Sequence, residues 1–219
     1  MAEAPDGWNH NVHYHPVIFE AIPARCASAL DVGCGTGRLT RELRRVVPSV
    51  TGIDRDERSI AVARSRAGSA GIEYRCGDLL ELALPPGGFD LVTAVASVHH
   101  MDTASAVGRM QELLRPGGVL VVIGLARDGS PLDLAVSAAA AVDHRIQRFR
   151  HRPRQNQGDD TPPGSPAAAG ADASYQPPIV WPPAETYGQI RRLAGTLLPG
   201  LRYRRHLLWR YSVRWEKPG

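Results

Sequence analysis

Cysteine and long apolar runs are both scarce in this sequence of 219 residues. The three cysteines, Cys26, Cys34 and Cys76, form no CxxC pair, which argues against a disulfide framework and against a structural zinc site. The longest apolar run, residues 118–126, is far shorter than the ~20 residues that a membrane helix needs. The N-terminal stretch carries acids and histidines and has no apolar signal core. We therefore expect a cytoplasmic protein that does not act at a membrane.

Lysine is almost missing, because 25 of the 26 basic residues are arginine. The charge is also uneven along the chain. Residues 1–130 hold 13 basic and 15 acidic residues, whereas residues 131–219 hold 13 basic and 7 acidic ones. A basic surface can attract an acidic partner, although a solvated arginine-rich face is the simpler interpretation. With 43% hydrophobic and 22% charged residues, the composition excludes a mostly disordered chain.

Apolar stretches alternate with helical spacing along the first part of the chain. Five short strands are predicted, over residues 29–32, 50–53, 72–75, 89–94 and 119–125. Helical spacing occurs beside them over residues 17–24, 37–47, 57–67 and 107–114. Strands that alternate with helices are typical of a parallel sheet covered on both faces. A last helix over 184–198 and two strands over 202–207 and 210–215 follow, and the two strands predict a hairpin.

We expect a single domain over residues 1–219, because the chain is too short for two full enzyme domains. Residues 1–24 are predicted to form an N-terminal lid and helix. Residues 131–180 are interpreted as an insertion that contains a further helix over 132–149. Residues 153–178 are rich in Pro, Gly, Ala and Ser, so they cannot bury enough apolar surface to offset the entropy of ordering. We expect that part of the insertion to be mobile.

The strongest local signal is a glycine-rich turn at the junction of the first strand and a helix. It reads Leu30-Asp31-Val32-Gly33-Cys34-Gly35-Thr36-Gly37. Glycines at such a junction allow a tight turn and a close approach of the backbone to a ligand. A dinucleotide-binding GxGxxG would have its third glycine at position 38, which is arginine here, and the chain has no GKS or GKT of a P-loop. By itself the turn indicates a nucleotide-like ligand.

Acidic residues follow the next two predicted strands. Asp54, at the end of the second strand, can accept hydrogen bonds from both hydroxyls of a ribose, which indicates a ribose but not which cofactor. Asp78 follows the third strand and can accept from an adenine amino group, while Leu79 stacks against the ring. Simpler roles remain open for these acids: Asp31 as a cap of the turn, Asp54 as a loop acid, and Asp78 as a cap of the segment that follows it.

Two further motifs follow in order, Phe89-Asp90-Leu91-Val92 and Leu114-Arg115-Pro116-Gly117-Gly118. We interpret the Phe89-Asp90 pair as structural. With all these motifs in place, the chain resembles the class I S-adenosylmethionine-dependent methyltransferases, in particular the small-molecule group near the ubiquinone and menaquinone methyltransferases. The resemblance covers about residues 13–126. It implies an α/β, Rossmann-like fold with a seven-stranded, mostly parallel sheet and an antiparallel C-terminal hairpin strand.

The resemblance also implies S-adenosyl-L-methionine as the cofactor and S-adenosyl-L-homocysteine as the product. Asp31, Gly33 and Gly35 would contact the methionine part of the cofactor, and Cys34 would contribute its backbone. Val95, at the tip of the fourth strand, would line the methionine side through its backbone. We interpret the Cys34 thiol as a small packed group and not as a nucleophile.

The adenosine side of the cofactor is assigned in the same way. By resemblance, Asp54 would hold the ribose and Arg55 would flank the adenine. Asp78 and Leu79 would hold the adenine, and Tyr14 would belong to an aromatic segment that folds over the cofactor as a lid.

Histidines supply the catalytic candidates, because a hydroxyl acceptor needs a general base and a histidine pKa of ~6.5 suits that task. His99 and His100 follow the fourth strand, at the edge where ligands bind in open α/β sheets. Neighbours in a helix point in different directions, so we expect only one of them to face the site and choose His99. His13 and His15 flank Tyr14 and are the other catalytic candidates. We expect four further histidines at the surface, namely His10, His144, His151 and His206.

No cluster of acids supports a metal, so none is predicted. Two motifs of nucleic-acid methyltransferases are missing, since Ala94-Val95-Ala96-Ser97 stands in place of Asn/Asp-Pro-Pro-aromatic and no Pro-Cys nucleophile is present. The arginine cluster within residues 145–154 lacks interleaved aromatic residues apart from Phe149. We therefore expect methyl transfer to an oxygen or nitrogen of a small organic metabolite, by a monomer or homodimer. A peptide or tRNA methyltransferase and a non-catalytic cofactor-binding module are the alternatives.

Overall fold

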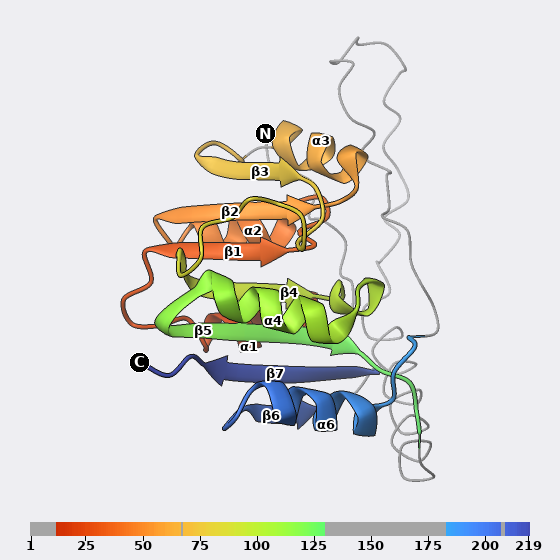
Figure 1. The fold of residues 1–219 in the computed structure, drawn as a ribbon. Coiled ribbons are helices and arrows are strands. Elements are labelled where there is room, and N and C mark those ends of the chain that lie inside the picture. The colour runs from red at the N-terminus through yellow and green to blue at the C-terminus, as the bar shows by residue number, and fades with distance from the viewer. Residues whose placement is uncertain (1–11, 67, 130–182, 207–208) are drawn as a thin grey trace, which may run out of the picture.

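The computed structural model describes residues 12–66, 68–129, 183–206 and 209–219 (Figure 1). A seven-stranded sheet with the order β3-β2-β1-β4-β5-β7-β6 forms its centre. The strands are Ser28–Val32 (β1), Ser49–Asp54 (β2), Ile72–Cys76 (β3), Phe89–Val95 (β4), Leu114–Leu125 (β5), Arg202–Arg205 (β6) and Arg210–Glu216 (β7). The first five strands pair in parallel, and β7 lies antiparallel between β5 and β6. The predicted fold, with its closing hairpin, is therefore confirmed.

Helices cover both faces of this sheet. They are η1 (Val12–Tyr14), α1 (His15–Phe19), α2 (Arg38–Arg44), α3 (Glu57–Ser65), η2 (Val98–His100), α4 (Thr103–Leu113) and α6 (Tyr187–Leu197). In Figure 1, α4 and α6 lie in front of the sheet, while α1 and α2 lie behind it. Successive strand residues therefore enter different core clusters: Leu30 packs on the side of α4 and α6, and Ala29 on the side of α1 and α2. Burial on both faces explains why the strands read as continuous apolar runs.

Helix starts differ from the predicted ones where a capping residue decides them. The side chain of Asp102 accepts a backbone amide, so α4 begins earlier than its apolar spacing indicates. Thr186 and Gln189 form a capping box, so α6 begins at the following tyrosine and not at residue 184. The first helix begins at His15, with Pro16 in its first turn, where a proline costs no hydrogen bond.

The fifth strand is longer than predicted. Leu114 already pairs with Phe89, and the register then shifts before Leu91 pairs with Val119. The Pro-Gly-Gly motif thus forms an irregularity within β5, where we had predicted a break before the strand. Gly117 has a φ of 75°, a conformation that favours glycine.

The carboxyl ends of the parallel strands lie at one edge of the sheet, on the right in Figure 1. The start of β7 reaches the same edge, because Arg210 pairs with Leu125 at the end of β5. The predicted insertion over 131–180 and the beginning of the predicted lid lie outside the described residues, so the domain division stays a prediction. No helix in the described part of the chain is both long and apolar enough to cross a membrane.

Candidate active site

The glycine-rich turn joins β1 to α2 at the carboxyl edge of the sheet. Gly33, Gly35 and Gly37 have φ values of 69°, 52° and 77°, a region that favours glycine. A Cβ atom on Gly33 would lie 2.3 Å from the Cβ of Ser97, which no native packing permits. The amide of Gly33 donates to the carbonyl of Ile53 at 2.8 Å, which ties the turn to β2. The turn therefore lies between the end of β1 and the end of β2.

Asp54, the last residue of β2, bonds directly to this turn. Its Oδ2 accepts from the amide of Gly35 at 2.8 Å, and its Oδ1 accepts from the amide of Asp56 at 2.9 Å. The amide of Gly77, just after β3, donates to the backbone carbonyl of Asp54 at 2.9 Å. The turn and the tips of β2 and β3 thus meet at one residue, Asp54, whose carboxylate bonds to the turn and whose backbone carbonyl bonds to the residue after β3. A carboxylate offers about four acceptor positions, so these bonds leave capacity for further donors.

Asp31 and Cys34 point into the protein. The carboxylate of Asp31 is 2% exposed and accepts from the hydroxyls of Thr40 at 2.7 Å and Thr93 at 3.1 Å. Burial raises the pKa of Asp31 to about 6. Burial also raises the pKa of the Cys34 thiol, with the charge of Asp31 adding to the effect. The inert, packed thiol agrees with the interpretation of Cys34 as a structural side chain.

The three residues predicted to contact the adenine differ in their exposure and in their contacts. Oδ1 of Asp78 accepts from the amide of Leu80 at 2.8 Å, the capping role that the sequence left open. The side chain of Leu79 is 3% exposed and packs in the larger core cluster. Arg55 is exposed, and its charge lowers the pKa of His100. Contacts of these residues with an adenine remain predictions.

The tip of β4 is a strained bend next to the tip of β1. Val95 ends the strand, and Ala96 follows with a φ of 51°, rare for a residue other than glycine. The amide of Ala96 donates to the carbonyl of Ile123 at 2.8 Å. The hydroxyl of Ser97 donates to the carbonyl of Val32 at 2.8 Å. These bonds hold the bend that carries the following histidines.

His99 and His100 end this bend with their rings side by side. The ring centroids are 4.1 Å apart at an interplanar angle of 37°. Both Nδ1 atoms are buried without a hydrogen-bond partner among the described residues. Burial, then the charges of His100 and Arg210, lower the pKa of His99 to about 4. Burial and the charge of Arg55 lower that of His100, and Asp54 opposes this shift.

The two rings therefore lie in contact, and the expectation that only one of them, His99, faces the site stays a prediction. A short 3-10 turn at the strand tip lets the two neighbouring rings lie in contact, which regular α-helical geometry would prevent. The sequence signal for His100 was present, since it belongs to the same doublet.

The N-terminal segment reaches the β6–β7 hairpin. Tyr14 is 6% exposed, and its ring centroid lies 4.9 Å from that of His13 and 5.0 Å from that of His206. The Nε2 atom of His206 lies 2.7 Å from the hydroxyl of Ser212. His206 is half-buried between these contacts, so it is only partly exposed at the surface. Only the hairpin brings it there, because it is far from Tyr14 in the sequence.

His15 is held away from this aromatic group. Its ring is buried, and its Nδ1 lies 2.6 Å from Oε2 of Glu42 on α2. This contact fastens α1 to α2. His15 thus joins two helices, whereas His13 is exposed beside Tyr14.

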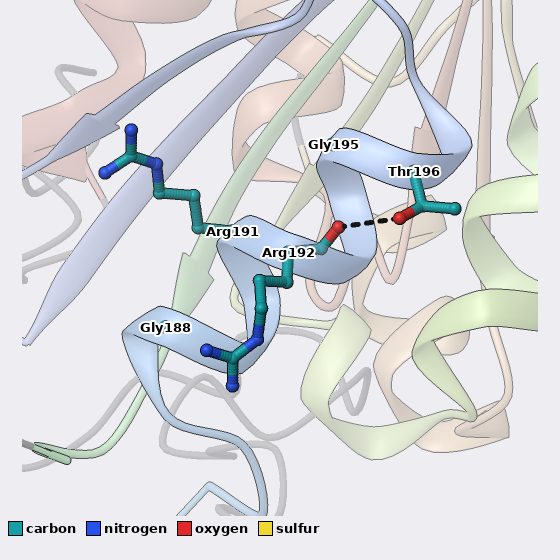
Figure 2. A pocket seen from close by; sticks show the side chains of 5 residues that line it. All are labelled: Gly188, Arg191, Arg192, Gly195 and Thr196. Atoms are coloured by element: carbon teal, nitrogen blue, oxygen red, sulfur yellow. Dashed lines mark hydrogen bonds between the residues drawn. The ribbon is translucent and has the colours of Figure 1, made fainter.

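An open groove lies on the outer side of α6 (Figure 2). It is lined by Gly188, Arg191, Arg192, Gly195 and Thr196. The hydroxyl of Thr196 donates to the carbonyl of Arg192 at 3.1 Å, and the two guanidinium groups point away from each other. None of the residues predicted for the site lines this groove.

A metal site was not predicted. Within the described ranges, no group of three or more His, Cys, Asp or Glu side chains is placed to hold a metal ion.

Comparison with known proteins identifies the family. Residues 30–122 match the model of a methyltransferase domain. Over 217 residues the chain is 32% identical to an uncharacterized methyltransferase from Mycobacterium tuberculosis, covering 96% of this chain and 98% of that relative. This chain belongs to the S-adenosylmethionine-dependent methyltransferases.

Two further matches place this methyltransferase among its relatives. It is 36% identical over 125 residues to a ubiquinone biosynthesis O-methyltransferase from Bradyrhizobium sp. (strain ORS 278), covering 56% of this chain and 49% of that enzyme. The crystal structure of the PH0226 protein from Pyrococcus horikoshii OT3 matches with a TM-score of 0.61 at 17% identity, covering 93% of this chain and 87% of that one. The second likeness shows the fold alone.

The residues of this methyltransferase fit an adenosyl group. The Asp54 carboxylate retains acceptor capacity for hydroxyl donors beside the turn. The buried Nδ1 atoms of His99 and His100 lack hydrogen-bond partners among the described residues. A buried polar atom without a hydrogen bond costs free energy, and a bound ligand that forms the missing bond removes that cost. Asp54 and the histidine pair therefore offer acceptors to a ligand that carries a ribose.

Proposed function

We propose that this methyltransferase transfers the methyl group of S-adenosylmethionine to an oxygen or nitrogen of a small organic metabolite. One observation carries the proposal: the hydrogen bond from the Gly35 amide to Asp54, which joins the glycine-rich turn and the ribose acceptor at one point. Gly33 and Gly35 lie on the methionine side of this point, together with the Asp31 and Cys34 backbone and Val95. S-adenosylmethionine supplies an electrophilic methyl group on a sulfonium.

The adenosine side is formed by the tips of β2 and β3. Asp54 accepts the ribose hydroxyls through its remaining lone pairs. Arg55 flanks the adenine from its exposed position, and Asp78 with the Leu79 backbone borders the same end. The bond between Gly77 and Asp54 supports this assignment, because it brings the tips of β2 and β3 together.

The acceptor side is formed by His99, Tyr14 and His13. The main task of this side is alignment, because methyl transfer is an in-line displacement. The low pKa of His99 leaves its ring neutral at pH 7, so it can accept a proton, although as a weak base. Tyr14 and His13, whose rings lie in contact, form the N-terminal part of this side. His15 is buried and contacts Glu42 of α2, so we assign it as a positioning residue of the N-terminal segment.

A small acceptor is supported by the relatives of the chain. The Bradyrhizobium relative is named for O-methylation in ubiquinone biosynthesis. The alternative of a tRNA or peptide substrate rests on the basic back half of the sequence, and the arginine cluster within residues 145–154 lies outside the described residues. Transfer to tRNA would fall steeply as salt rises, whereas transfer to a neutral metabolite would not.

Calorimetric titration with S-adenosylmethionine tests the cofactor site. Asp54→Asn removes the charge with little change of shape, and Glu57→Gln makes the same change at an exposed acid nearby. We expect Asp54→Asn to weaken binding at least tenfold, because hydrogen bonds to a charged group contribute about 1.5–3 kcal/mol. Glu57→Gln should bind as the wild type does. Equal binding by Asp54→Asn would contradict the assignment of Asp54 to the ribose.

A further inference from the structure

Ser97 connects the bend after β4 to the glycine-rich turn. It stands directly before η2, a position in which a serine side chain usually caps the helix that follows. Here the side chain makes no capping bond. Its hydroxyl donates instead to the carbonyl of Val32 at 2.8 Å, although 65 residues separate the two in the sequence. The serine hydroxyl therefore joins two strand ends and does not stabilise the start of its own helix.

The contact of Ser97 with the turn fixes the first peptide group of the turn. Val32 supplies the carbonyl of this peptide group, and Gly33 supplies its amide, which donates to the carbonyl of Ile53 at 2.8 Å. The planar group is thus held from β2 on one side and from Ser97 on the other. A Cβ atom on Gly33 would lie 2.3 Å from Cβ and 2.9 Å from Oγ of Ser97. The serine side chain therefore lies directly against the turn.

The backbone of Ser97 holds the histidine pair, His99 and His100. Its carbonyl accepts from the amide of His100 at 3.1 Å, which closes the short turn of η2. The amide of Met101 donates to the carbonyl of Val98 at 3.0 Å, and the side chain of Val98 is 2% exposed in the core cluster of α4 and α6. The pair is therefore held by Ser97 on one side and by the core on the other.

The backbone before Ser97 is strained, so its position depends on the contacts around it. Ala96 has a φ of 51°, and strained backbone persists only where neighbouring groups hold it. Two contacts hold this bend, from the amide of Ala96 to the carbonyl of Ile123 and from the hydroxyl of Ser97 to Val32. Loss of the hydroxyl removes one of them, so η2 can then shift relative to the turn.

We propose that Ser97 is a positioning residue that sets the distance between the glycine-rich turn and the histidine pair, and so aligns the acceptor with the methyl group. The inference rests on the proposed function, in which the turn holds the methionine side of the cofactor and His99 belongs to the acceptor side. Methyl transfer is an in-line displacement, and a displacement of about 1 Å can lower its rate about 100-fold. Ser97 acts through its neighbours and makes no bond to the acceptor.

NMR spectra of the histidine rings test the geometry of this inference. Ser97→Ala removes the hydroxyl and keeps the Cβ atom against the turn. We expect the ring signals of His99 and His100 to move, because rings with centroids 4.1 Å apart shift each other's resonances when their relative position changes. The signals of His15 should stay, because Glu42 holds that ring on α2. The substitutions His99→Gln and His100→Gln assign the signals, and signals that do not move in Ser97→Ala would overturn the inference.

Ser28→Ala is the matched control. The hydroxyl of Ser28, at the start of β1, donates to the carbonyl of Gly88, just before β4, at 3.0 Å. This bond joins the same two strands at the opposite edge of the sheet, so its loss should leave the signals of the histidine pair unchanged. Ser97→Thr keeps a hydroxyl and should give signals close to those of the wild type. Equal movement of the signals in Ser28→Ala and Ser97→Ala would overturn the role of Ser97.

Radiolabelled methyl transfer and calorimetry separate alignment from cofactor binding. Phenol, catechol and aniline are the probe acceptors, and the kinetics are measured with the one that the wild-type protein methylates fastest. Ser97→Ala should lower kcat between about 10- and 100-fold. Its Kd for S-adenosylmethionine should stay close to that of the wild type. An unchanged kcat, or a loss of cofactor affinity as large as the loss of kcat, would overturn the inference.

Failure of the proposed function is a separate outcome. A wild-type protein that binds no S-adenosylmethionine in the calorimeter would contradict the proposed function. The signals of the histidine pair decide whether Ser97 positions the two rings, whichever probe acceptor the protein methylates.

Discussion

The amide of Gly35, in the turn after β1, donates a 2.8 Å hydrogen bond to Oδ2 of Asp54 at the end of the neighbouring strand β2. This bond connects a turn that glycine permits with a carboxylate that the end of β2 presents. The proposed cofactor site needs both the turn and the carboxylate, because the turn alone has no side chain that accepts hydrogen bonds from ribose hydroxyls. Four consequences of the surrounding packing can be measured on the protein itself.

Gly33→Ala should destabilise the protein by more than about 2 kcal/mol. Its φ of 69° costs an alanine about 1–2 kcal/mol, and its Cβ would lie 2.3 Å from that of Ser97. Urea denaturation measures the change. Gly108→Ala in α4 is the control, since its Cβ would meet nothing within 4 Å, and it should stabilise by about 0.5–1 kcal/mol. Similar effects from the two substitutions would show that the turn tolerates a side chain.

The buried Asp31 should make stability depend on pH. Its pKa in the folded protein is about 6, above the ordinary 3.8, so the folded state holds this proton more tightly than the unfolded state. The stabilisation is full below about pH 4 and is lost as pH rises through 6, a change on the order of 3 kcal/mol. Asp31→Asn cannot titrate and keeps a similar shape.

Urea denaturation of the wild-type protein and of Asp31→Asn at pH 4, 5, 6 and 7 measures this dependence. The stability difference, wild type minus variant, should fall between pH 4 and pH 6 and then level off. A difference that rises with pH would mean that the carboxylate is stabilised in the folded protein, against its burial between Thr40 and Thr93.

The contact between His15 and Glu42 should stabilise the N-terminal helix. A double-mutant cycle with His15→Ala and Glu42→Ala should give a coupling energy of about 1 kcal/mol, because the imidazole is buried and the contact is 2.6 Å. The pair of Arg109 and Glu112, in which the glutamate is exposed, is the comparison and should couple by no more than about 0.5 kcal/mol. Equal coupling energies in the two cycles would contradict the positioning role assigned to His15.

Ala96→Gly should increase stability, which is unusual for a substitution by glycine. The φ of 51° costs an alanine about 1–2 kcal/mol, and relief of this strain outweighs the entropy that glycine loses. We expect a gain of about 0.5–1 kcal/mol in thermal or urea unfolding. Ala94→Gly, two positions earlier in β4 and fully buried, should cost about 1–2 kcal/mol. A loss at both positions would show that Ala96 is not strained.

The Phe89-Asp90 pair shows which part of a structural role the local sequence pattern can predict. We interpreted Asp90 as structural, and its Oδ2 accepts from the amides of Ala27 and Ser28 at the start of β1, while Oδ1 lies 2.8 Å from Arg115. The sequence predicted a structural role for Asp90, but it did not predict which groups Asp90 contacts. Those partners lie on other strands, and only the sheet brings them to Asp90.

Hydrophobic periodicity was enough to predict the parallel sheet and its closing hairpin, and the ordered motifs carried the resemblance to the family, because these signals are local in the chain. The tertiary structure alone decided which polar groups meet. It placed His206 beside the N-terminal segment, joined His15 to Glu42, and brought the rings of His99 and His100 into contact. Contacts between distant segments depend on strand order and on how the loops at the sheet edge meet, and neither is encoded in a local sequence pattern.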